Sequence, residues 1–521
     1  MFSLEDILGG RVSRAGDALE YFAQSSGNSL AVSDDTRVLS YSELAKELLI
    51  WKHELQDKGL RAGDRCVVVM ENCTTAISLF YAIQSLDAWP IIVNARMTFN
   101  EIHWIIDHCK PRLVVFLGAE SPPAAAHSKT MSAERLNLAG ASIVGHLATK
   151  SEPVFDDAAQ QTGVLIYTSG STGKPKGVML SHRTLLFNAA VVAQERGYSP
   201  EDSIYGLAPL SHSLGLGVLL SAMHSGAHYR AVARFDPADF VRLALAHKIT
   251  VFNAPPAAYH RLMTYIEAND IDVSETRLRI LGAGSAPLDP LLKERVTSAF
   301  RRPLHNGYGI TETGPSIAFS RPNSPAPDMS IGPPLPHVET CIIDPKGRAV
   351  SIDDVGELWV RGPGLMLGYY KDPAATEAAF RPGGWFASGD LVSEDASGNL
   401  HVRGRLKELI IRSGFNVYPA EIESILNNDP SVAASAVVGK NVDGNEEIIA
   451  FIQPHRGQQP SIERLRTRLR ESLAPYKQPS RIFVLEQLPQ TATGKVLKHA
   501  LVVSPQSESG SDEIADAAGK N

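Results

Sequence analysis

One segment of this chain has the residue types and the spacing of an anion-binding loop. Residues 167–178 read Tyr-Thr-Ser-Gly-Ser-Thr-Gly-Lys-Pro-Lys-Gly-Val and directly follow the apolar run Val164-Leu165-Ile166. Glycines let backbone N–H groups converge, hydroxyls add donors, and the lysines supply positive charge. A solvated linker is a poor alternative, because linkers rarely follow a buried strand with two lysines fixed around a proline. The segment therefore predicts a phosphate-binding loop.

Two common phosphate-binding loops do not match this sequence. The P-loop of NTPases needs a glycine where this chain has Thr168, and a serine or threonine where it has Pro175. The dinucleotide fingerprint fails as well, because Gly282-Ala283-Gly284 is followed by Pro287 at the position of the third glycine. The loop must therefore bind phosphate by another architecture.

Companion motifs follow this loop in a fixed order along the chain. They are Asn306–Thr313 (Asn-Gly-Tyr-Gly-Ile-Thr-Glu-Thr), Gly356-Glu357-Leu358 leading to Gly368-Tyr369-Tyr370, Ser388-Gly389-Asp390, Gly404–Glu423 and Pro489–Lys495. Together with the loop they resemble the signatures of the adenylate-forming superfamily, which includes acyl-CoA synthetases, adenylation domains of peptide synthetases and firefly-luciferase-like enzymes. The resemblance covers residues 167 to 495, and the length of the N-terminal part is compatible with it.

The resemblance implies a two-step activation of a small-molecule carboxylic acid, with ATP, Mg²⁺ and coenzyme A. A carboxylate is a poor electrophile, and its attack on ATP brings like charges together. Adenylation overcomes both obstacles if the site neutralises the α-phosphate and lets pyrophosphate leave. Positioned cations and donors therefore matter more here than a covalent nucleophile.

The resemblance assigns the phosphates and the metal to particular residues. Glu312 would bind Mg²⁺, a hard cation that prefers carboxylate and phosphate oxygens, and Thr311 would contact the α-phosphate. The β- and γ-phosphates would be held by Thr168, Ser169, Gly170, Ser171, Thr172, Gly173 and Lys176.

The nucleoside is implied to lie against three further segments. Tyr308 would stack on adenine, and Gly284 would allow close approach of the backbone. Asp390 would accept both ribose hydroxyls, since a carboxylate is an acceptor-only group, and Arg405 would make a second ribose contact. The residues implied for this part of the site are Gly284, Asn306, Tyr308, Gly309, Asp390 and Arg405.

Lys495 is the leading candidate for the catalytic residue of adenylation. By resemblance, it would bridge the carboxylate and the α-phosphate as a compact point charge. The family usually has arginine three residues later, where this chain has Lys498. Since the charge is kept, we expect little effect of this departure on catalysis.

The thioester step is implied to need a rotation of the C-terminal domain. In the family this domain turns about a hinge residue, which aligns with Lys407. The face around Ser413 and Gly414 would then admit the pantetheine thiol, and His212 matches a histidine beside the acyl and pantetheine channel.

The acid itself is only partly constrained by sequence. The segments that match the acyl pocket of relatives are mostly small or apolar: 212–217, 252–256 and 284–286. Amino-acid-activating domains carry an aspartate where this chain has Ser211–Leu214, so an amino acid is disfavoured. A medium-length aliphatic or an aromatic acid fits the apolar lining. An enzyme that loads a carrier-protein thiol is the alternative function, and a nucleotide-binding protein without catalysis is a third.

The pattern of strands and helices expected around these residues indicates an α/β fold. Apolar runs such as 66–70, 113–117 and 249–253 alternate with helical patterns, which indicates βαβ units and parallel sheets. We expect a large N-terminal domain of two doubly wound subdomains plus a small β-barrel, followed by a small α+β domain. The expected boundaries are 1–403, 404–505 for the mobile catalytic domain, and 506–521 for a disordered tail.

Composition sets the broad class. With 44% apolar and 21% charged residues, the 521-residue chain has an ordinary globular profile. A net charge of −7 argues against nucleic acid as a partner. The uncharged stretch 203–229 contains a proline and three histidines, so we expect no membrane span. Four scattered cysteines favour reduced thiols and a cytoplasmic location. The oligomeric state stays open, and a homodimer is among the states allowed.

Overall fold

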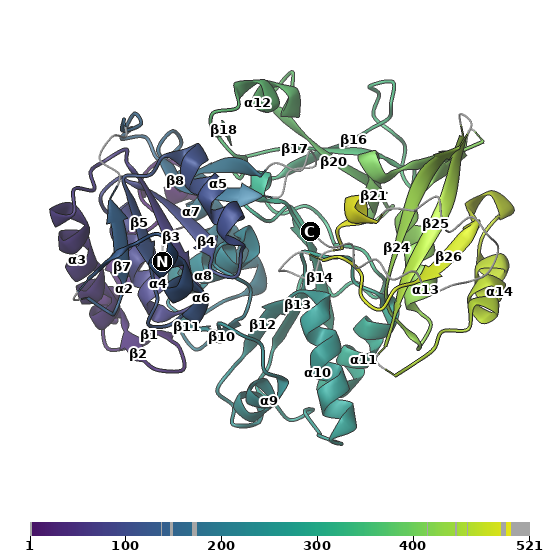
Figure 1. Cartoon of the computed structure of the whole chain (residues 1–521), viewed down its shortest axis with the longest axis horizontal. Helices are drawn as coiled ribbons and strands as arrows, with labels where there is room; N and C mark the ends of the chain where they lie inside the picture. The colour runs from purple at the N-terminus through teal and green to yellow at the C-terminus, as the bar shows by residue number, and fades with distance from the viewer. Residues whose placement is uncertain are drawn as a thin grey trace.

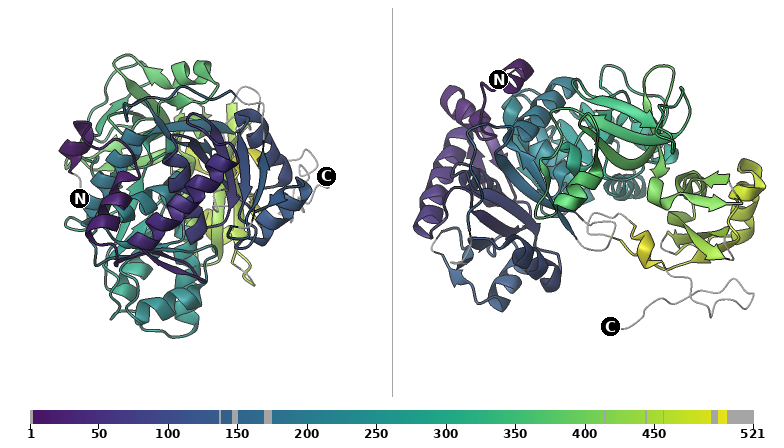
Figure 2. Two further views of the ribbon diagram at one scale, coloured as in Figure 1. Left: turned by 90° about the vertical axis from the view of Figure 1, so that its left-hand side faces the viewer. Right: turned by 90° about the horizontal axis from the view of Figure 1, so that it is seen from above.

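The computed structural model describes residues 3–136, 138–145, 150–168, 175–413, 415–442, 445–455, 457–490 and 496–501. Loop residues 169–174, Gly414, Lys495 and the predicted tail 506–521 therefore lie outside the described residues. Figure 1 shows that α14 (Ile462–Ser472) in the C-terminal part lies at the opposite end of the molecule from α3 (Tyr41–Asp57), and the view from above in Figure 2 agrees.

The first sheet has five strands in the order β4-β3-β5-β7-β6. Its interior strand β3 is buried throughout and pairs in parallel with β4 and β5. Val68 packs with α3 and α4, whereas Val67 on the other face packs with α5, so helices cover both sides. The elements are α3, β3 (Arg65–Met70), α4 (Thr74–Gln84), β4 (Trp89–Asn94), α5 (Phe99–Cys109), β5 (Leu113–Phe116), α6 (Pro122–Thr130), β6 (Glu134–Arg135) and β7 (Ser142–Gly145).

The second sheet has eight strands in the order β15-β14-β13-β12-β10-β11-β1-β2, parallel except at its two edges. Tyr205 and Phe252 pack on α9–α11, and Ile204 and Val251 face the opposite cluster with α8. The elements are α1 (Leu4–Leu8), α2 (Asp17–Ser25), β1 (Leu30–Ser33), β2 (Val38–Ser40), α7 (His182–Arg196), β10 (Ser203–Gly206), α8 (Ser213–Ser225), β11 (His228–Ala231), α9 (Pro237–Leu245), β12 (Val251–Ala254), α10 (Pro256–Ala268), β13 (Ile280–Ala283), α11 (Pro290–Phe300), β14 (Leu304–Tyr308) and β15 (Ala318–Phe319).

One strand differs from the expected βαβ alternation. The apolar run 163–167 lies in β8 (Thr162–Thr168), which joins neither large sheet. It pairs antiparallel with β9 (Lys176–Ser181), and β9 pairs antiparallel with β18 (Gly368–Tyr369). A short apolar run shows that a strand is buried, but not which strand pairs with it. The predicted phosphate-binding loop therefore lies between the two paired strands of a hairpin.

The remaining strands form smaller units. A five-stranded antiparallel sheet occupies the place of the predicted barrel, and its elements are β16 (Glu339–Ile343), β17 (Gly356–Arg361), α12 (Pro373–Ala379), β19 (Phe380–Arg381), β20 (Trp385–Glu394) and β21 (Leu400–Arg405). The C-terminal unit has its own core and consists of β22 (Ile410–Arg412), β23 (Phe415–Val417), α13 (Pro419–Asn427), β24 (Val432–Val442), β25 (Asn445–Pro454), α14 and β26 (Arg481–Val484). The predicted fold class is confirmed. The residue boundaries stay predictions, and the one after residue 403 falls within β21.

The uncharged stretch 203–229 folds as β10, α8 and the start of β11, with most of its residues buried in the large sheet. No helix in the described ranges is both long and apolar enough to cross a membrane. Three of the four cysteines are buried and Cys341 is partly exposed, and all four are free thiols.

Candidate active site

The two ends of the predicted phosphate-binding loop are fixed by the hairpin ladder. Thr168, the last residue of β8, pairs with Lys176, the first residue of β9. The intervening residues 169–174 lie outside the described part, so their predicted phosphate contacts stay predictions. The ammonium of Lys176 lies 4.6 Å from the centroid of the Tyr369 ring, over its face.

Tyr369 connects this lysine to the predicted metal ligand. Its hydroxyl donates a hydrogen bond of 2.9 Å to Oε1 of Glu312, which belongs to the 3₁₀ turn η1 (Thr311–Thr313). Burial, together with the Glu312 carboxylate, raises the pKa of Tyr369, so the phenol stays a neutral donor. The pairing of β18 with β9 brings these residues together, and the sequence alone did not reveal it.

Glu312 suits Mg²⁺ by its chemistry. It is half-buried, and none of the described residues forms an ion pair with it. A carboxylate with one oxygen oriented by a phenol leaves the other free for a hard cation, and Mg²⁺ commonly binds one or two carboxylates together with substrate phosphates. Nearby, Thr311 Oγ1 lies 3.1 Å from Ser213 Oγ at the start of α8.

His212 immediately precedes α8 and is half-buried. Its backbone N–H donates to the carbonyl of Pro209 at 2.9 Å. Burial lowers the pKa of its imidazole, so the ring is neutral at physiological pH. A neutral imidazole suits a channel wall better than a fixed charge would.

The predicted ribose ligand lies in a short hydrogen-bonded chain. Asp390 is 3% exposed, and its Oδ1 lies 3.1 Å from Nε of Arg405. Its Oδ2 accepts a hydrogen bond of 2.5 Å from the hydroxyl of Tyr308. Burial, then the Asp390 carboxylate, raise the pKa of Tyr308. Each carboxylate oxygen still has a lone pair for a ribose hydroxyl. The stacking predicted for Tyr308 stays a prediction.

Two other motif residues have structural tasks. The side-chain amide of Asn306 donates to the carbonyl of Met329 at 3.1 Å. A Cβ on Gly309 would lie 1.6 Å from the carbonyl oxygen of Pro315, so only glycine fits there. Gly284 is less constrained, since its Cβ would meet nothing closer than the Gly307 oxygen at 3.5 Å.

The residues implied for the thioester step lie in the C-terminal part. Lys407 is exposed in the 3₁₀ turn η2 (Leu406–Glu408). Ser413 has a φ of 51° and donates its backbone N–H to Oδ1 of Asn445 at 2.7 Å. Beside Gly414, the exposed ring of Phe415 stacks on Tyr476 with centroids 4.5 Å apart. Their roles in thioester formation stay predictions.

Backbone hydrogen bonds fix the described residues on both sides of Lys495. Gln490 and Val496 form an antiparallel bridge, and the N–H of Leu497 donates to the Pro489 carbonyl at 2.7 Å. Lys498 Nζ lies 2.8 Å from both Glu408 and Glu423. Burial disfavours its charge, but the two carboxylates outweigh burial and raise the pKa of Lys498. Lys498 therefore ties this segment to Glu408, next to the predicted hinge residue, and its effect on catalysis stays a prediction.

A large cavity joins the three segments predicted to line the acyl pocket. It contains about 720 Å³ of space between protein atoms, open solvent at its mouth included. Ser213, Asn253 and Gly284 represent the three segments, and Tyr308 and Gly309 of the nucleotide motif complete the wall. Its aromatic lining consists of Tyr198, Tyr308 and Phe319. Sequence analysis missed Arg196, which also lines it.

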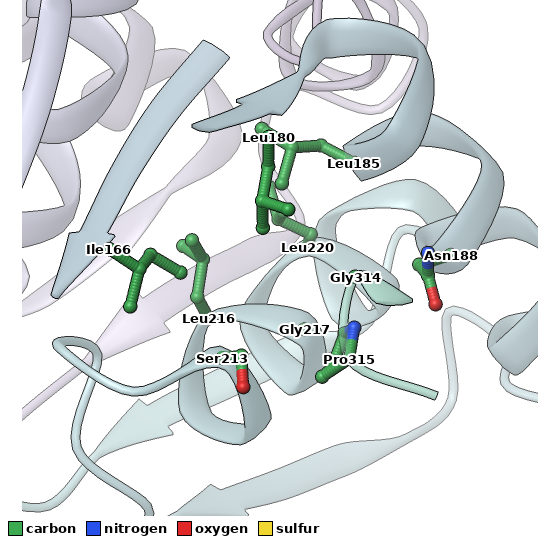
Figure 3. A pocket seen from close by; sticks show the side chains of 10 residues that line it. All are labelled: Ile166, Leu180, Leu185, Asn188, Ser213, Leu216, Gly217, Leu220, Gly314 and Pro315. Carbon is green, nitrogen blue, oxygen red and sulfur yellow. The ribbon is translucent and has the colours of Figure 1, made fainter. Parts of the chain in front are cut away.

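A smaller cavity of about 220 Å³ lies beside it. Figure 3 shows its apolar wall, with leucines of β9, α7 and α8 pointing toward Ile166 of β8. The two cavities share Asn188, Ser213, Gly217 and Pro315. The cavity predicted to hold the acyl group therefore adjoins the strands that flank the predicted phosphate-binding loop.

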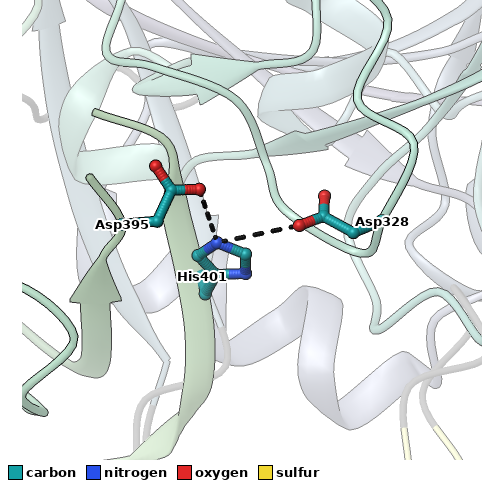
Figure 4. A group of neighbouring side chains, drawn as sticks. All are labelled: Asp328, Asp395 and His401. Atoms are coloured by element: carbon teal, nitrogen blue, oxygen red, sulfur yellow. Dashed lines mark hydrogen bonds and ion pairs between the residues drawn. The ribbon is translucent and has the colours of Figure 1, made fainter. Parts of the chain in front are cut away.

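A histidine and two aspartates away from Glu312 lie close enough together to hold a metal ion (Figure 4). His401 Nε2 lies 3.1 Å from Asp395 and 4.0 Å from Asp328. Asp395 also accepts the backbone N–H groups of Ser397 and Asn399, and these hydrogen bonds lower its pKa. The cluster is thus a capped turn that His401 reinforces.

The fold and the ordered motifs define the class of adenylate-forming enzymes. A family model described as AMP-binding enzyme matches residues 19–370, and one for the C-terminal domain of AMP-binding enzymes matches residues 421–495. The chain belongs to this family.

Curated proteins and solved structures that are similar to this chain support its assignment to this family. The chain is 31% identical to a 2-succinylbenzoate–CoA ligase of Geobacillus kaustophilus, over 91% of this chain and 94% of that protein. It is 31% identical to a feruloyl-CoA synthase of Amycolatopsis, over 91% and 96%. Among solved structures it resembles ATP-bound MatB of Rhodopseudomonas palustris, with 28% identity, a TM-score of 0.81 and coverage of 93% and 98%. It also resembles o-succinylbenzoate CoA synthetase of Bacillus subtilis in complex with ATP and magnesium ion, with 25% identity, a TM-score of 0.80 and coverage of 92% and 98%. The predicted enzyme class, an AMP-forming acyl-CoA synthetase, is confirmed at that level.

Proposed function

We propose that this enzyme is an acid–CoA ligase for an aromatic carboxylic acid. ATP and the acid would give acyl-AMP and pyrophosphate, and coenzyme A would then take the acyl group as a thioester. The observation that carries this proposal is the cavity lined by three aromatic rings that reaches the Tyr308–Gly309 motif. Names of relatives support it, since two act on 2-succinylbenzoate and ferulate. A medium-chain aliphatic acid remains the second candidate.

In the adenylation step, Glu312 would hold Mg²⁺, which when bound neutralises phosphate charge. Tyr369 orients the Glu312 carboxylate through its hydrogen bond, and its ring supports the ammonium of Lys176. Thr311 would donate to the α-phosphate. The hydrogen bond between Thr311 and Ser213, which lines the cavity, supports placing the reacting carboxylate on that side of the cavity.

The nucleoside would bind where two sheets meet. Asp390 would accept the ribose hydroxyls while Arg405 and Tyr308 hold its carboxylate in place. Lys495 would bridge the acid and the α-phosphate, because a lysine carries a compact charge that can follow the reacting oxygens.

For the second step, we propose that the C-terminal domain rotates about Lys407 and presents Ser413 and Gly414 to the pantetheine arm. His212, neutral and half-buried, would line the channel through which the thiol approaches. The CoA-ligase names of the relatives favour free coenzyme A over a carrier protein as acceptor. A cytoplasmic location and a homodimer stay predictions.

A substrate panel tests the proposal. Purified enzyme is incubated with ATP, Mg²⁺, coenzyme A and single aromatic or aliphatic acids, and both AMP and acyl-CoA are quantified. Thioester formation from aromatic acids supports the proposal, and a preference for aliphatic acids moves it to the second candidate. AMP formation without acyl-CoA, followed by transfer to a phosphopantetheinyl carrier protein, would refute coenzyme A as the acceptor.

A further inference from the structure

Arg196 is a buried cation in the wall of the acyl cavity. It is the last residue of α7 and only 7% exposed. No carboxylate lies within ion-pair distance of it in the described part of the chain. Two acids near it in sequence are engaged elsewhere, because Glu195 pairs with Arg321 and Asp202 pairs with Arg279.

The guanidinium of Arg196 packs on an aromatic ring of the cavity wall. Its centre lies 4.2 Å from the centroid of the Phe319 ring. Its Nη1 has no hydrogen-bond partner among the described residues. A Cβ added to Gly282 would lie 3.5 Å from this Nη1 and 2.2 Å from Oδ1 of Asn253, so glycine lies in β13 where the side chains of Arg196 and Asn253 both approach the strand.

Other polar groups lie in the same wall. The side-chain amide of Asn253 donates to the hydroxyl of Tyr198 at 2.8 Å, and both residues line the cavity with Arg196. The rest of the lining is mostly small or apolar. An apolar pocket with a few convergent polar groups orients a ligand through those groups.

A buried guanidinium without a carboxylate partner favours the binding of an anion. Arginine stays protonated in proteins, and burying an unpaired charge is costly. The carbonyl end of α7 and the Phe319 ring offset part of that cost. They leave Nη1 without an acceptor among the described residues, and the planar fork of a guanidinium matches a carboxylate better than any neutral group.

We infer that Arg196 binds a second carboxylate of the acyl substrate, so that the preferred acid is a dicarboxylate. This inference rests on the proposed function. The carboxylate that reacts would lie at Thr311 and Lys495, and Thr311 does not line this cavity. The second carboxylate would accept hydrogen bonds from the guanidinium of Arg196, while the body of the acid packs against the aromatic lining.

Pairs of acids that differ by one charge test the inference. The value of kcat/KM for thioester formation is measured for suberate and terephthalate and for their monomethyl esters. The wild-type enzyme should prefer each diacid by about 10-fold or more, since a hydrogen bond to a charged group contributes about 1.5–3 kcal/mol. Arg196→Met should bring this preference to about 1 or invert it, and Arg196→Lys should give an intermediate ratio.

Arg261→Met is the matched control. Arg261 also stacks on a phenylalanine, with 5.4 Å to the Phe235 centroid, but it is exposed and outside the cavity. Its variant should keep the wild-type preference. A wild-type enzyme that prefers the monoesters overturns the inference, as does an Arg196→Met variant that keeps the ratio. If Arg196→Met does not fold, the wild-type panel and Arg196→Lys decide. Monoester turnover without a diacid preference would leave the ligase function standing, whereas no thioester from any acid would remove both.

Discussion

Asp390 and Arg405 are directly opposed in the antiparallel ladder of β20 and β21, and Nε of Arg405 lies 3.1 Å from Oδ1 of Asp390. The register of two neighbouring strands thus fixes a carboxylate that the hydroxyl of Tyr308, from the large sheet, holds on its other side. The proposed ribose ligand is therefore oriented before any nucleotide binds, which lowers the entropic cost of binding.

Asp390→Asn should raise the KM for ATP by about 10- to 100-fold, because hydrogen bonds to a charged group contribute about 1.5–3 kcal/mol. Tyr308→Phe keeps the Asp390 carboxylate and should raise the KM for ATP only about 3- to 10-fold. ATP–pyrophosphate exchange at varied ATP measures both. Equal effects of the two changes would contradict the assignment of Asp390 as the direct ligand.

Tyr369→Phe should raise the Mg²⁺ concentration needed for half-maximal adenylation by about 5-fold, because Glu312 loses the donor that orients it. Tyr370→Phe is the matched control, since its hydroxyl donates instead to Glu152 at 2.6 Å. Magnesium titrations of the exchange reaction compare the two. If both variants shift alike, Tyr369 has no special link to the metal site.

Lys498→Met should destabilise the C-terminal unit by about 3 kcal/mol, because it leaves Glu408 and Glu423 without their shared cation. Lys498→Arg keeps the charge and should retain most of the stability. Denaturant unfolding, followed by a probe in the C-terminal unit, measures the change. Wild-type stability in the methionine variant would show that the two ion pairs contribute nothing.

Lys495→Ala should nearly abolish acyl-AMP formation and leave thioester formation from supplied acyl-AMP largely intact, since the two half-reactions are proposed to use different faces of the C-terminal domain. Each half-reaction is assayed separately with rapid quench. An equal loss in both would refute the separation of roles.

The free energy of unfolding should fall as pH drops from about 6.5 toward 4. Burial lowers the pKa of His182 to about 3, and its Nδ1 accepts the N–H of Ala15 at 3.1 Å. Below about pH 6.5 the unfolded chain binds a proton at His182 that the native state does not bind. This group therefore lowers the free energy of unfolding by about 1.4 kcal/mol per pH unit. His182→Gln should show a shallower pH dependence in denaturant titrations; an unchanged slope would assign the acid sensitivity to other groups.

The sequence predicts much of this molecule because its signals are local. Buried runs such as Arg65–Met70 read directly as parallel strands. Glu312 and Asp390 were found because each lies in a motif of contiguous residues. The link from Lys176 through Tyr369 to Glu312 depends on the pairing of β9 with β18, nearly two hundred residues apart, which no local pattern encodes.

Arg196 was missed for a related reason. A basic residue in the last turn of a helix is ordinary, since it complements the helix dipole. Only the tertiary structure shows that this one is buried in a cavity without a carboxylate partner in the described residues. Its signal lies in the unbonded Nη1, which sequence patterns do not contain.

The lack of space for a side chain at Gly309 has a consequence for genetic experiments. Every missense change of that codon introduces at least a methyl group where the carbonyl of Pro315 leaves 1.6 Å. Alleles at this codon should therefore be null whatever amino acid they encode. A strain with such an allele would supply a loss-of-function reference for growth experiments on candidate acids.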